Sequence, residues 1–178
     1  MSAVKRLALS ARTALAVCAC IANMGFGGVA LADDSAIQLN GDGLMHTQSA
    51  YSVEETVNRI RADVEAKGIK FFADIDQSEL GKGAGIELEP SRLLIFGNPP
   101  LGVLFLTSAA DSGMDWPVRM LVRQEKDGEV LVVYQNWDWV AERYGIEDRV
   151  AEFSKATEVV MSIVSSVSKC KEVAECTH

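Results

Sequence analysis

Two carboxylates, Asp74 and Asp76, are the residues of this sequence best suited by type and spacing to acid–base chemistry. They belong to an alternating segment around residues 69–75 that predicts a β-strand, so both side chains are expected on one strand face. Paired carboxylates can transfer protons when burial separates their pKa values. A solvated acidic turn is the alternative. Calcium binding is disfavoured, because a calcium loop needs glycine at the position of Glu79 and glutamate at that of Gly85.

A second set of residues could bind a ligand. The stretch from Tyr134 to Tyr144 is the densest aromatic group of the chain, which predicts core packing, dimer packing or the wall of an apolar pocket. Asn98 precedes two prolines and is expected to cap a helix. An anion site at that helix start is the weaker interpretation, since the prolines remove two of its amides. The candidate ligand-binding residues are Phe96, Asn98, Tyr134, Trp137 and Tyr144.

Other catalytic arrangements lack their residues. Beyond residue 32 the sequence has only His46 and His178, and it has no Gly-x-Ser-x-Gly elbow, so a hydrolase triad is not expected. Cys170 and Cys176, with His178, are too few ligands for a structural zinc site. We therefore expect no metal and no cofactor. The two cysteines are expected to form one disulfide, with free thiols as the alternative.

Residues 1–32 have the pattern of a signal peptide. Basic residues precede an uncharged run of small and apolar residues, and Ala30-Leu31-Ala32 is typical of a signal peptidase site. A transmembrane anchor is disfavoured because glycines interrupt the run and no positive charge follows it. A lipoprotein is a further alternative, since the segment around Cys18 and Cys20 loosely resembles a lipobox. We expect cleavage after Ala32, a periplasmic or secreted protein, and no stable membrane association afterwards.

The charge of the remaining chain excludes some partners. Three of the 17 Lys and Arg lie in residues 1–32 and none of the 25 Asp and Glu does, which leaves 14 against 25, a net charge of −11. Such a surface repels phosphate backbones and anionic lipid headgroups. We therefore expect no nucleic-acid partner.

Strands and helices must position the candidate residues. The expected strands are residues 44–51, 69–75, 92–96, 118–124 and 129–135. The expected helices are residues 53–67, a segment after Asn98, residues 137–144 and residues 147–168. The Asp127-Gly128 pair predicts a hairpin. This order predicts an α+β fold with helices on one face of a largely antiparallel sheet.

Several local features are expected within these elements. Ser52 and Glu55 form a capping box, and Gly68 ends the helix that the box begins. Strict alternation would place Phe71 on the same strand face as Ala73 and Ile75. Residues 76–85 are a loop or short helix, and residues 109–114 are a loop. The segment 101–106 is apolar on every side, which predicts burial by the core or by a partner.

The chain divides into a signal peptide (1–32), a flexible lead-in (33–43), one α+β domain (44–168) and a C-terminal tail with the possible disulfide (169–178). Its stretches from Ala73 to Asp76 and from Arg92 to Pro99 resemble the DUF302 family. So do the segments 56–68, 117–122 and 141–145. The resemblance implies a fold like that of the TATA-box protein, a homodimer and no established activity. The fold does not imply DNA binding.

The chain also departs from the family pattern. Gln77 and Tyr144 stand where that pattern commonly has histidine, and residues 102–106 differ from the usual stretch after Asn-Pro. Any chemistry that relatives perform with those histidines is therefore not expected here. We expect an exported, non-catalytic dimeric module that binds a small molecule or a partner protein. The alternative is a periplasmic enzyme that uses Asp74 and Asp76 in an aromatic-lined pocket.

Overall fold

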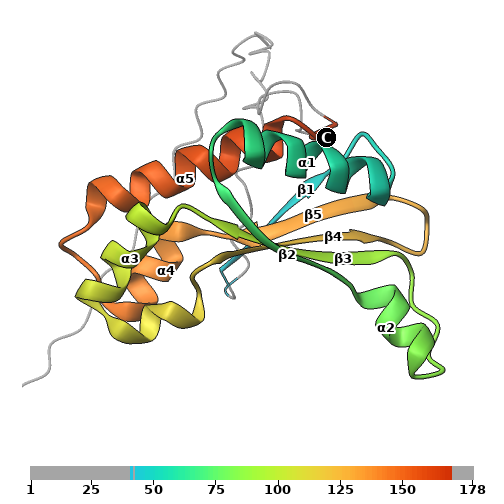
Figure 1. Ribbon diagram of the computed structural model, residues 1–178, viewed down its shortest axis with the longest axis horizontal. Coiled ribbons are helices and arrows are strands. Elements are labelled where there is room, and N and C mark those ends of the chain that lie inside the picture. The colour runs from blue at the N-terminus through green and yellow to red at the C-terminus, as the bar shows by residue number, and fades with distance from the viewer. Residues whose placement is uncertain (1–40, 42, 170–178) are drawn as a thin grey trace, which may run out of the picture. The chain divides into compact units, whose positions relative to one another are not determined.

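A five-stranded antiparallel sheet forms the centre of the computed structural model, which describes residue 41 and residues 43–169 (Figure 1). The strands lie in the order β1-β5-β4-β3-β2, and every neighbouring pair is antiparallel. Their bounds are β1 Leu44–Gln48, β2 Lys70–Asp76, β3 Ser91–Gly97, β4 Val118–Gln124 and β5 Val130–Gln135. The expected α+β fold is confirmed.

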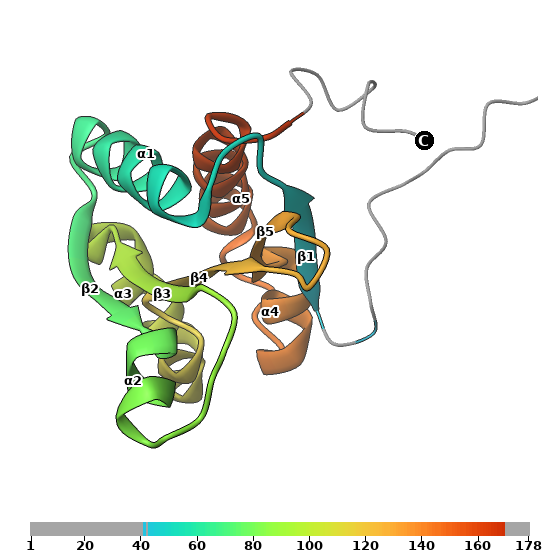
Figure 2. The same cartoon turned by 90° about the vertical axis from the view of Figure 1, so that its right-hand side faces the viewer.

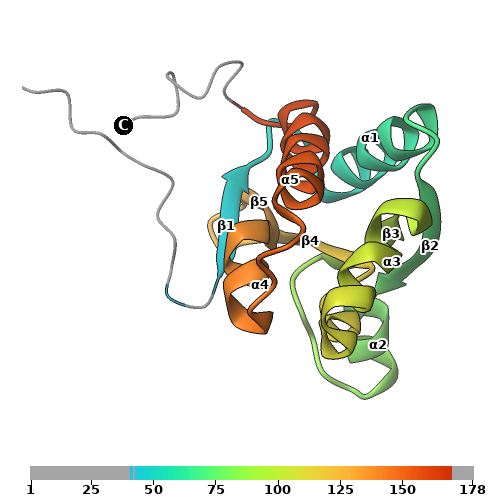
Figure 3. The ribbon, with the colours of Figure 1, turned by 90° about the vertical axis from the view of Figure 1, so that its left-hand side faces the viewer.

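Two long helices cover one face of this sheet, α1 (Val53–Ala66) and α5 (Val150–Ser165). Figures 2 and 3 show both on the same side of the strands. The shorter helices lie near the sheet's two ends: α3 (Pro99–Ser108), the 3₁₀ helix η1 (Ala110–Met114) and α4 (Trp137–Tyr144) at one, α2 (Gln77–Gly83) at the other.

The core fills the space between the sheet and the two long helices. Leu94, Met120 and Tyr134 lie opposite one another on successive strands and are buried. Ile60 of α1 and Ile163 of α5 are fully buried beside them. Burying a side chain of this size stabilises the fold by about 1.5–3 kcal/mol. Because the buried residues come from the strands and from both long helices, their packing fixes where the ends of α1 and α5 lie.

Helix α1 begins with one of the two hydrogen bonds of the expected capping box. The Ser52 hydroxyl accepts from the Glu55 amide at 3.3 Å. The Glu55 carboxylate instead accepts from Arg59 Nε at 2.7 Å, one turn along the helix. Gly68 has a φ of +66°, as expected of the residue that turns the chain out of α1.

The expected alternation in β2 is wrong at its start. The register shifts between Phe71 and Ala73, which is a β-bulge at Phe72. Phe71 therefore pairs with Phe96 on the face covered by the helices, where Arg61 of α1 lies over its ring. Ala73 and Ile75 lie on the opposite face. A bulge inserts one residue, so every side chain beyond it changes face.

Other expected bounds also change. Residues 110–114 form the 3₁₀ helix η1 rather than a loop, and α5 is shorter than the expected span 147–168. The segment 77–83 is a helix, α2. Within the described residues no helix is both long and apolar enough to cross a membrane. Cys170 and Cys176, the expected disulfide, lie outside the described residues.

Candidate functional site

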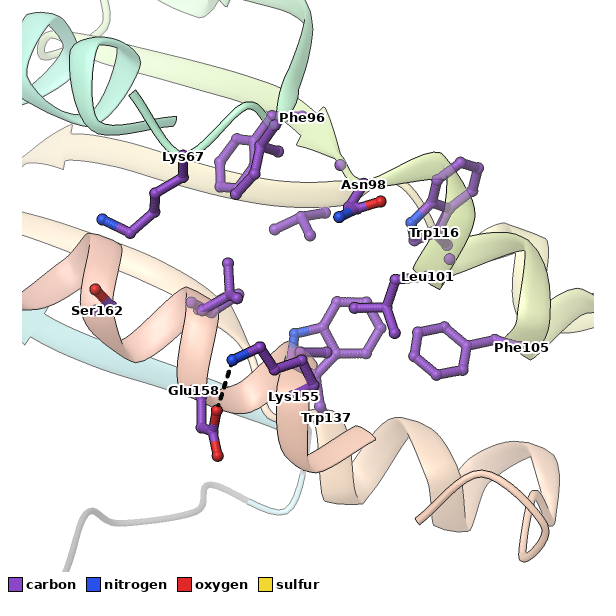
Figure 4. A pocket seen from close by; sticks show the side chains of 17 residues that line it. Lys67, Phe96, Asn98, Leu101, Phe105, Trp116, Trp137, Lys155, Glu158 and Ser162 are labelled. Carbon is purple, nitrogen blue, oxygen red and sulfur yellow. Dashed lines mark hydrogen bonds and ion pairs between the residues drawn. The ribbon is translucent and has the colours of Figure 1, made fainter. Parts of the chain in front are cut away.

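A cavity of about 560 Å³ opens between the end of α1, the end of β3, α3 and α5 (Figure 4). This volume falls within the range of small-molecule sites. Most of the wall is apolar; the polar and charged side chains in it are Lys67, Asn98, Lys155, Glu158 and Ser162. The apolar part comprises Ile69, Phe96, Leu101, Phe105, Trp116, Val118, Trp137, Ala156, Val159 and Val160.

Trp137 supplies a hydrogen-bond donor without a partner in this wall. It is 3% exposed, and its Nε1 is buried with no hydrogen bond. Helix α4 starts at this residue because the side chain of Asn136 accepts from the amides of Asp138 and Trp139. An indole nitrogen can only donate, so Nε1 is an unpaired donor beneath the surface of the cavity wall.

Neighbouring aromatic rings hold the indole of Trp137 in place. Its ring centroid lies 5.7 Å from that of Phe105 and 6.3 Å from that of Phe153. Phe105 and Phe153 stack at 4.3 Å, which joins α3 to α5. Contacts of this geometry are favourable beyond the burial of area. The donor is therefore part of a rigid wall.

Trp116 forms another part of the wall, and two glycines make room for it. A Cβ added to Gly102 in α3 would lie 1.8 Å from Trp116 Nε1, and one added to Gly97 would lie 3.2 Å from it. The indole makes a T-shaped contact with Phe72, with the ring centroids 6.5 Å apart. The glycine inside α3 is thus required by a close approach of a side chain to the helix backbone.

The charged side chains at the cavity come from two helices. Lys155 Nζ donates to Glu158 at 3.0 Å along α5, and Lys67, at the end of α1, pairs with Asp63. Each ammonium has three donors, so one carboxylate partner leaves donors free. The two lysines at the cavity are therefore balanced by two carboxylates, Asp63 and Glu158.

Asn98 precedes α3 as expected, but its side chain makes no capping hydrogen bond. Its carbonyl accepts from the amides of Leu101 and Gly102. Asn98 is solvent-exposed and lines the cavity, so its amide group is available at the cavity edge. The prolines at the first two helical positions leave few free amides for an anion at this helix start.

Three of the five candidate ligand-binding residues meet at this cavity: Phe96, Asn98 and Trp137. Tyr134 lies elsewhere in the core, where its hydroxyl is 3.3 Å from Thr47 Oγ1. Burial raises the pKa of Tyr134 above its ordinary value, and the hydrogen bond with Thr47 partly opposes this. Tyr144 points to Asp115, to which it donates at 2.7 Å.

The two candidate catalytic carboxylates do not line the cavity. Arg61 Nη2 donates to Asp74 Oδ2 at 2.7 Å and Arg92 Nε to Asp74 Oδ1 at 2.9 Å, so guanidinium groups engage both oxygens. Asp76 caps α2: the Glu79 amide and the Ser78 hydroxyl donate to it and lower its pKa. These contacts fix β2, α1 and α2 together, and neither carboxylate lines the cavity described above.

Sequence reasoning missed a buried acidic residue, Asp115. It is 3% exposed and accepts from Arg119 and Gln135 at 2.7 Å, from Tyr144 at 2.7 Å and from Arg143 at 3.2 Å. Its partners lie on β4, β5 and α4, so spacing along the chain gives no signal for the cluster. The following peptide bond, Trp116-Pro117, is cis.

The sequence also gave no expectation for Lys67, Lys155 or Trp116. A glycine inside the apolar helix after Asn98 was the one available signal, because such a glycine suggests close backbone approach. His46 is exposed on β1. Across residues 43–169 no group of three or more His, Cys, Asp or Glu side chains could hold a metal ion.

Known proteins share parts of this chain. It is 33% identical over 104 residues to proteins named fluoride-specific ion channel FluC 1 of Brucella suis and Brucella abortus and FluC 2 of Brucella melitensis. That match covers 58% of this chain and 38–41% of those relatives, so the chain spans about two fifths of their length.

A solved structure has the same fold. The uncharacterized conserved protein DUF302 from Bacillus stearothermophilus superposes with a TM-score of 0.64 at 13% identity, over 70% of this chain and 98% of that one. The model of the family described as "Domain of unknown function DUF302" matches residues 45–164. This chain belongs to the DUF302 family.

Proposed function

We propose that this protein is an exported, non-catalytic binding module that takes a small, largely apolar molecule into the cavity between α1, α3 and α5. The observation that carries the proposal is the cavity of about 560 Å³, whose wall is mostly apolar and aromatic. An apolar molecule would bury its surface against this wall, which makes the cavity a suitable binding site.

Two features support binding rather than catalysis. Both oxygens of Asp74 are engaged by arginines, and Asp76 serves as a helix cap outside the cavity. Glu158, the one acid in the cavity wall, pairs with Lys155. A general base needs an oxygen within reach of the substrate proton. An enzyme that works through Asp74 and Asp76 stays the alternative, and it would require a substrate outside this cavity.

The test is to fill the cavity and measure binding of a neutral hydrophobic fluorophore, N-phenyl-1-naphthylamine. Ala156 lines the cavity on α5, so Ala156→Leu should weaken dye binding at least tenfold. Ala151 is exposed on the same helix, and Ala151→Leu is the matched control that should bind as the wild type does. A wild-type protein that binds no dye, or equal binding by both variants, would contradict the proposal.

A second candidate function follows from the relatives named fluoride-specific ion channels. The described residues contain no membrane-crossing helix, so in this reading the chain serves a channel as an attached or associating domain. Deleting the gene should then sensitise cells to fluoride, and re-expression should restore growth. Unchanged fluoride tolerance of the deletion strain would count against it.

Export and dimerisation complete the proposal. Export is supported by the basic, apolar and small-residue pattern of residues 1–32, and N-terminal sequencing of the mature protein should begin at Asp33. Dimerisation is supported by Val103 and Leu104 on α3, which are exposed apolar residues.

A further inference from the structure

We infer that the ligand of this cavity is an uncharged molecule that joins an apolar body to a carboxamide group, and that Asn98 selects it by pairing its own side-chain amide with that group. The inference rests on the binding function proposed above. It adds the chemical class of the ligand and the residue that recognises it.

Asn98 has a side chain that the fold leaves unused. An asparagine before a helix normally accepts a hydrogen bond from the second or third helical amide. Here the second helical residue is Pro100, which has no N–H, and the amide of Leu101 donates to the backbone carbonyl of Asn98 at 3.1 Å. The Asn98 side chain makes no capping bond, and within the described residues it has no hydrogen-bond partner.

The position of Asn98 puts this amide at an apolar surface. Asn98 lines the cavity between the end of β3 and the start of α3, and Figure 4 shows its side chain among those that surround the cavity. Phe96 and Leu101 line the same cavity, and Gly97 lies against the indole of Trp116. A ligand that covers these side chains also displaces water from the Asn98 amide, which then needs ligand atoms as partners.

The Asn98 amide offers a donor and an acceptor side by side. Its nitrogen carries two N–H donors and its oxygen accepts. A ligand carboxamide has the same two groups in the reverse order, so the two amides can form two parallel hydrogen bonds. An ester supplies an acceptor only and would leave the Asn98 oxygen unpaired. That difference amounts to about a tenfold change in affinity.

The charges of the wall favour an uncharged ligand. All three charged side chains of the lining are in ion pairs, Lys67 with Asp63 and Lys155 with Glu158. A charged head group would therefore lose its hydration in a mostly apolar cavity without gaining an unpaired opposite charge. A carboxylate or an ammonium should bind more weakly than a neutral amide with the same apolar body.

The experiment compares ligands that share a phenyl ring on a four-carbon chain and differ in their head group. 4-Phenylbutanamide, methyl 4-phenylbutanoate, 4-phenylbutanoate and 4-phenylbutylammonium are titrated against protein loaded with N-phenyl-1-naphthylamine, and the affinity of the dye itself is measured for every protein. The amide should bind the wild type at least tenfold more tightly than the carboxylate and the ammonium do. The ester is more apolar than the amide, so the ratio of amide to ester affinity is compared between proteins.

Asn98→Leu assigns the recognition to this side chain. Leucine has the same branched shape as asparagine and makes neither hydrogen bond, so the ratio of amide to ester affinity should fall about tenfold. Asn58→Leu is the matched control, because Asn58 is exposed on α1 and lies outside the cavity. It should leave the ratio unchanged. Asn98→Leu should fold, since no capping bond is lost, and urea unfolding verifies this.

The outcomes separate the inference from the function on which it rests. If the dye binds and Ala156→Leu weakens its binding, but the amide to ester ratio is the same in the wild type and in Asn98→Leu, the cavity binds ligands and the carboxamide class is wrong. A carboxylate or an ammonium that binds the wild type as tightly as the amide does would also overturn the class. If the wild type binds no dye, both the function and the class are wrong.

Discussion

Asp115 joins two strands and a helix through one carboxylate. Its Oδ1 accepts from Arg119 and Gln135, and its Oδ2 from Tyr144 and Arg143. Four donors satisfy the acceptor sites of a buried carboxylate, which would otherwise be costly to bury. Trp116 follows directly, so the cluster anchors the chain at the point where it enters the cavity wall.

Tyr144 gives this cluster a measurable pH dependence. The hydrogen bond from Tyr144 to Asp115 raises the pKa of the phenol above its ordinary value of about 10, since ionisation would place two negative charges side by side. The folded state therefore holds this proton more tightly than the unfolded state. The stabilisation is complete below pH 10 and is lost as the pH rises through the higher folded-state pKa.

Tyr144→Phe should test this directly. The variant should lose about 1 kcal/mol of unfolding free energy at pH 8, because it removes one hydrogen bond to a carboxylate. The difference between wild type and variant should shrink above pH 10. Urea unfolding at pH 8, 9, 10 and 11 measures it, and a difference that stays constant or grows with pH would contradict the assigned contact.

Residue types alone indicated part of this picture. Asn98 and Trp137 were expected near a ligand from their surroundings in the sequence, and both line the cavity. Tyr144 belongs to the same aromatic stretch, yet it faces Asp115. Local sequence could not separate them, because their partners lie outside α4. Trp137 packs against residues of α3 and α5, and Tyr144 donates to Asp115, which follows η1.

At the scale of elements, α3 has a glycine at the position that the side chain of Trp116 approaches. Gly102 and Phe105 are its buried residues, and Val103 and Leu104 are exposed. The apolar pattern predicted that no single core could cover every side of this segment. It could not predict which residue the indole of Trp116 approaches, since that contact joins α3 to a residue beyond η1.

Gly102→Ala should displace Trp116. The added Cβ would overlap the indole, so the side chain must rotate or α3 must shift, and such overpacking costs about 1–3 kcal/mol. We expect a lower urea midpoint, a changed tryptophan fluorescence spectrum and weaker dye binding. Gly83→Ala, in the open last turn of α2, is the control and should be neutral or slightly stabilising. Unchanged fluorescence in Gly102→Ala would show that the indole lies elsewhere.

The limits of element prediction are clear in β2 and α1. The Ser52 cap and Gly68 turn follow from local chemistry and were correct. The bulge at Phe72 was not expected, because it depends on the register with β3. An alternating pattern specifies faces only while the ladder is unbroken.

At the scale of the molecule, the α+β class followed from the order of elements, and the order of strands did not. β1 pairs with β5, the last strand, through long-range hydrogen bonds that leave no local pattern. The cavity is similar: its lining runs from Lys67 to Ser162 and exists only after α1, α3 and α5 have packed on the sheet. Neither its size nor its charge could be read from separate segments.

The last prediction concerns assembly, and it depends on which exposed apolar side chains are covered in solution. Leu104 on α3 is 36% exposed and Val103 is 47% exposed, whereas Phe105 between α3 and α5 is buried at 2%. A two-fold symmetric pair lets one such patch cover its copy. We expect the wild type to sediment as a dimer and Leu104→Glu as a folded monomer. Phe105→Glu should unfold the protein, because it places a charge in the core.

Leu80→Glu separates this interface from other exposed apolar surface. Leu80 is 65% exposed on α2, which lies at the opposite end of the sheet from α3 (Figure 1). A glutamate there should leave a dimer that forms through α3 intact, since it adds the same charge at a distance from the contact. Sedimentation of the wild type, Leu104→Glu and Leu80→Glu at matched concentrations decides between the surfaces of α3 and α2. A monomeric wild type would contradict the dimer, and a dimer broken by Leu80→Glu but not by Leu104→Glu would move the interface to α2.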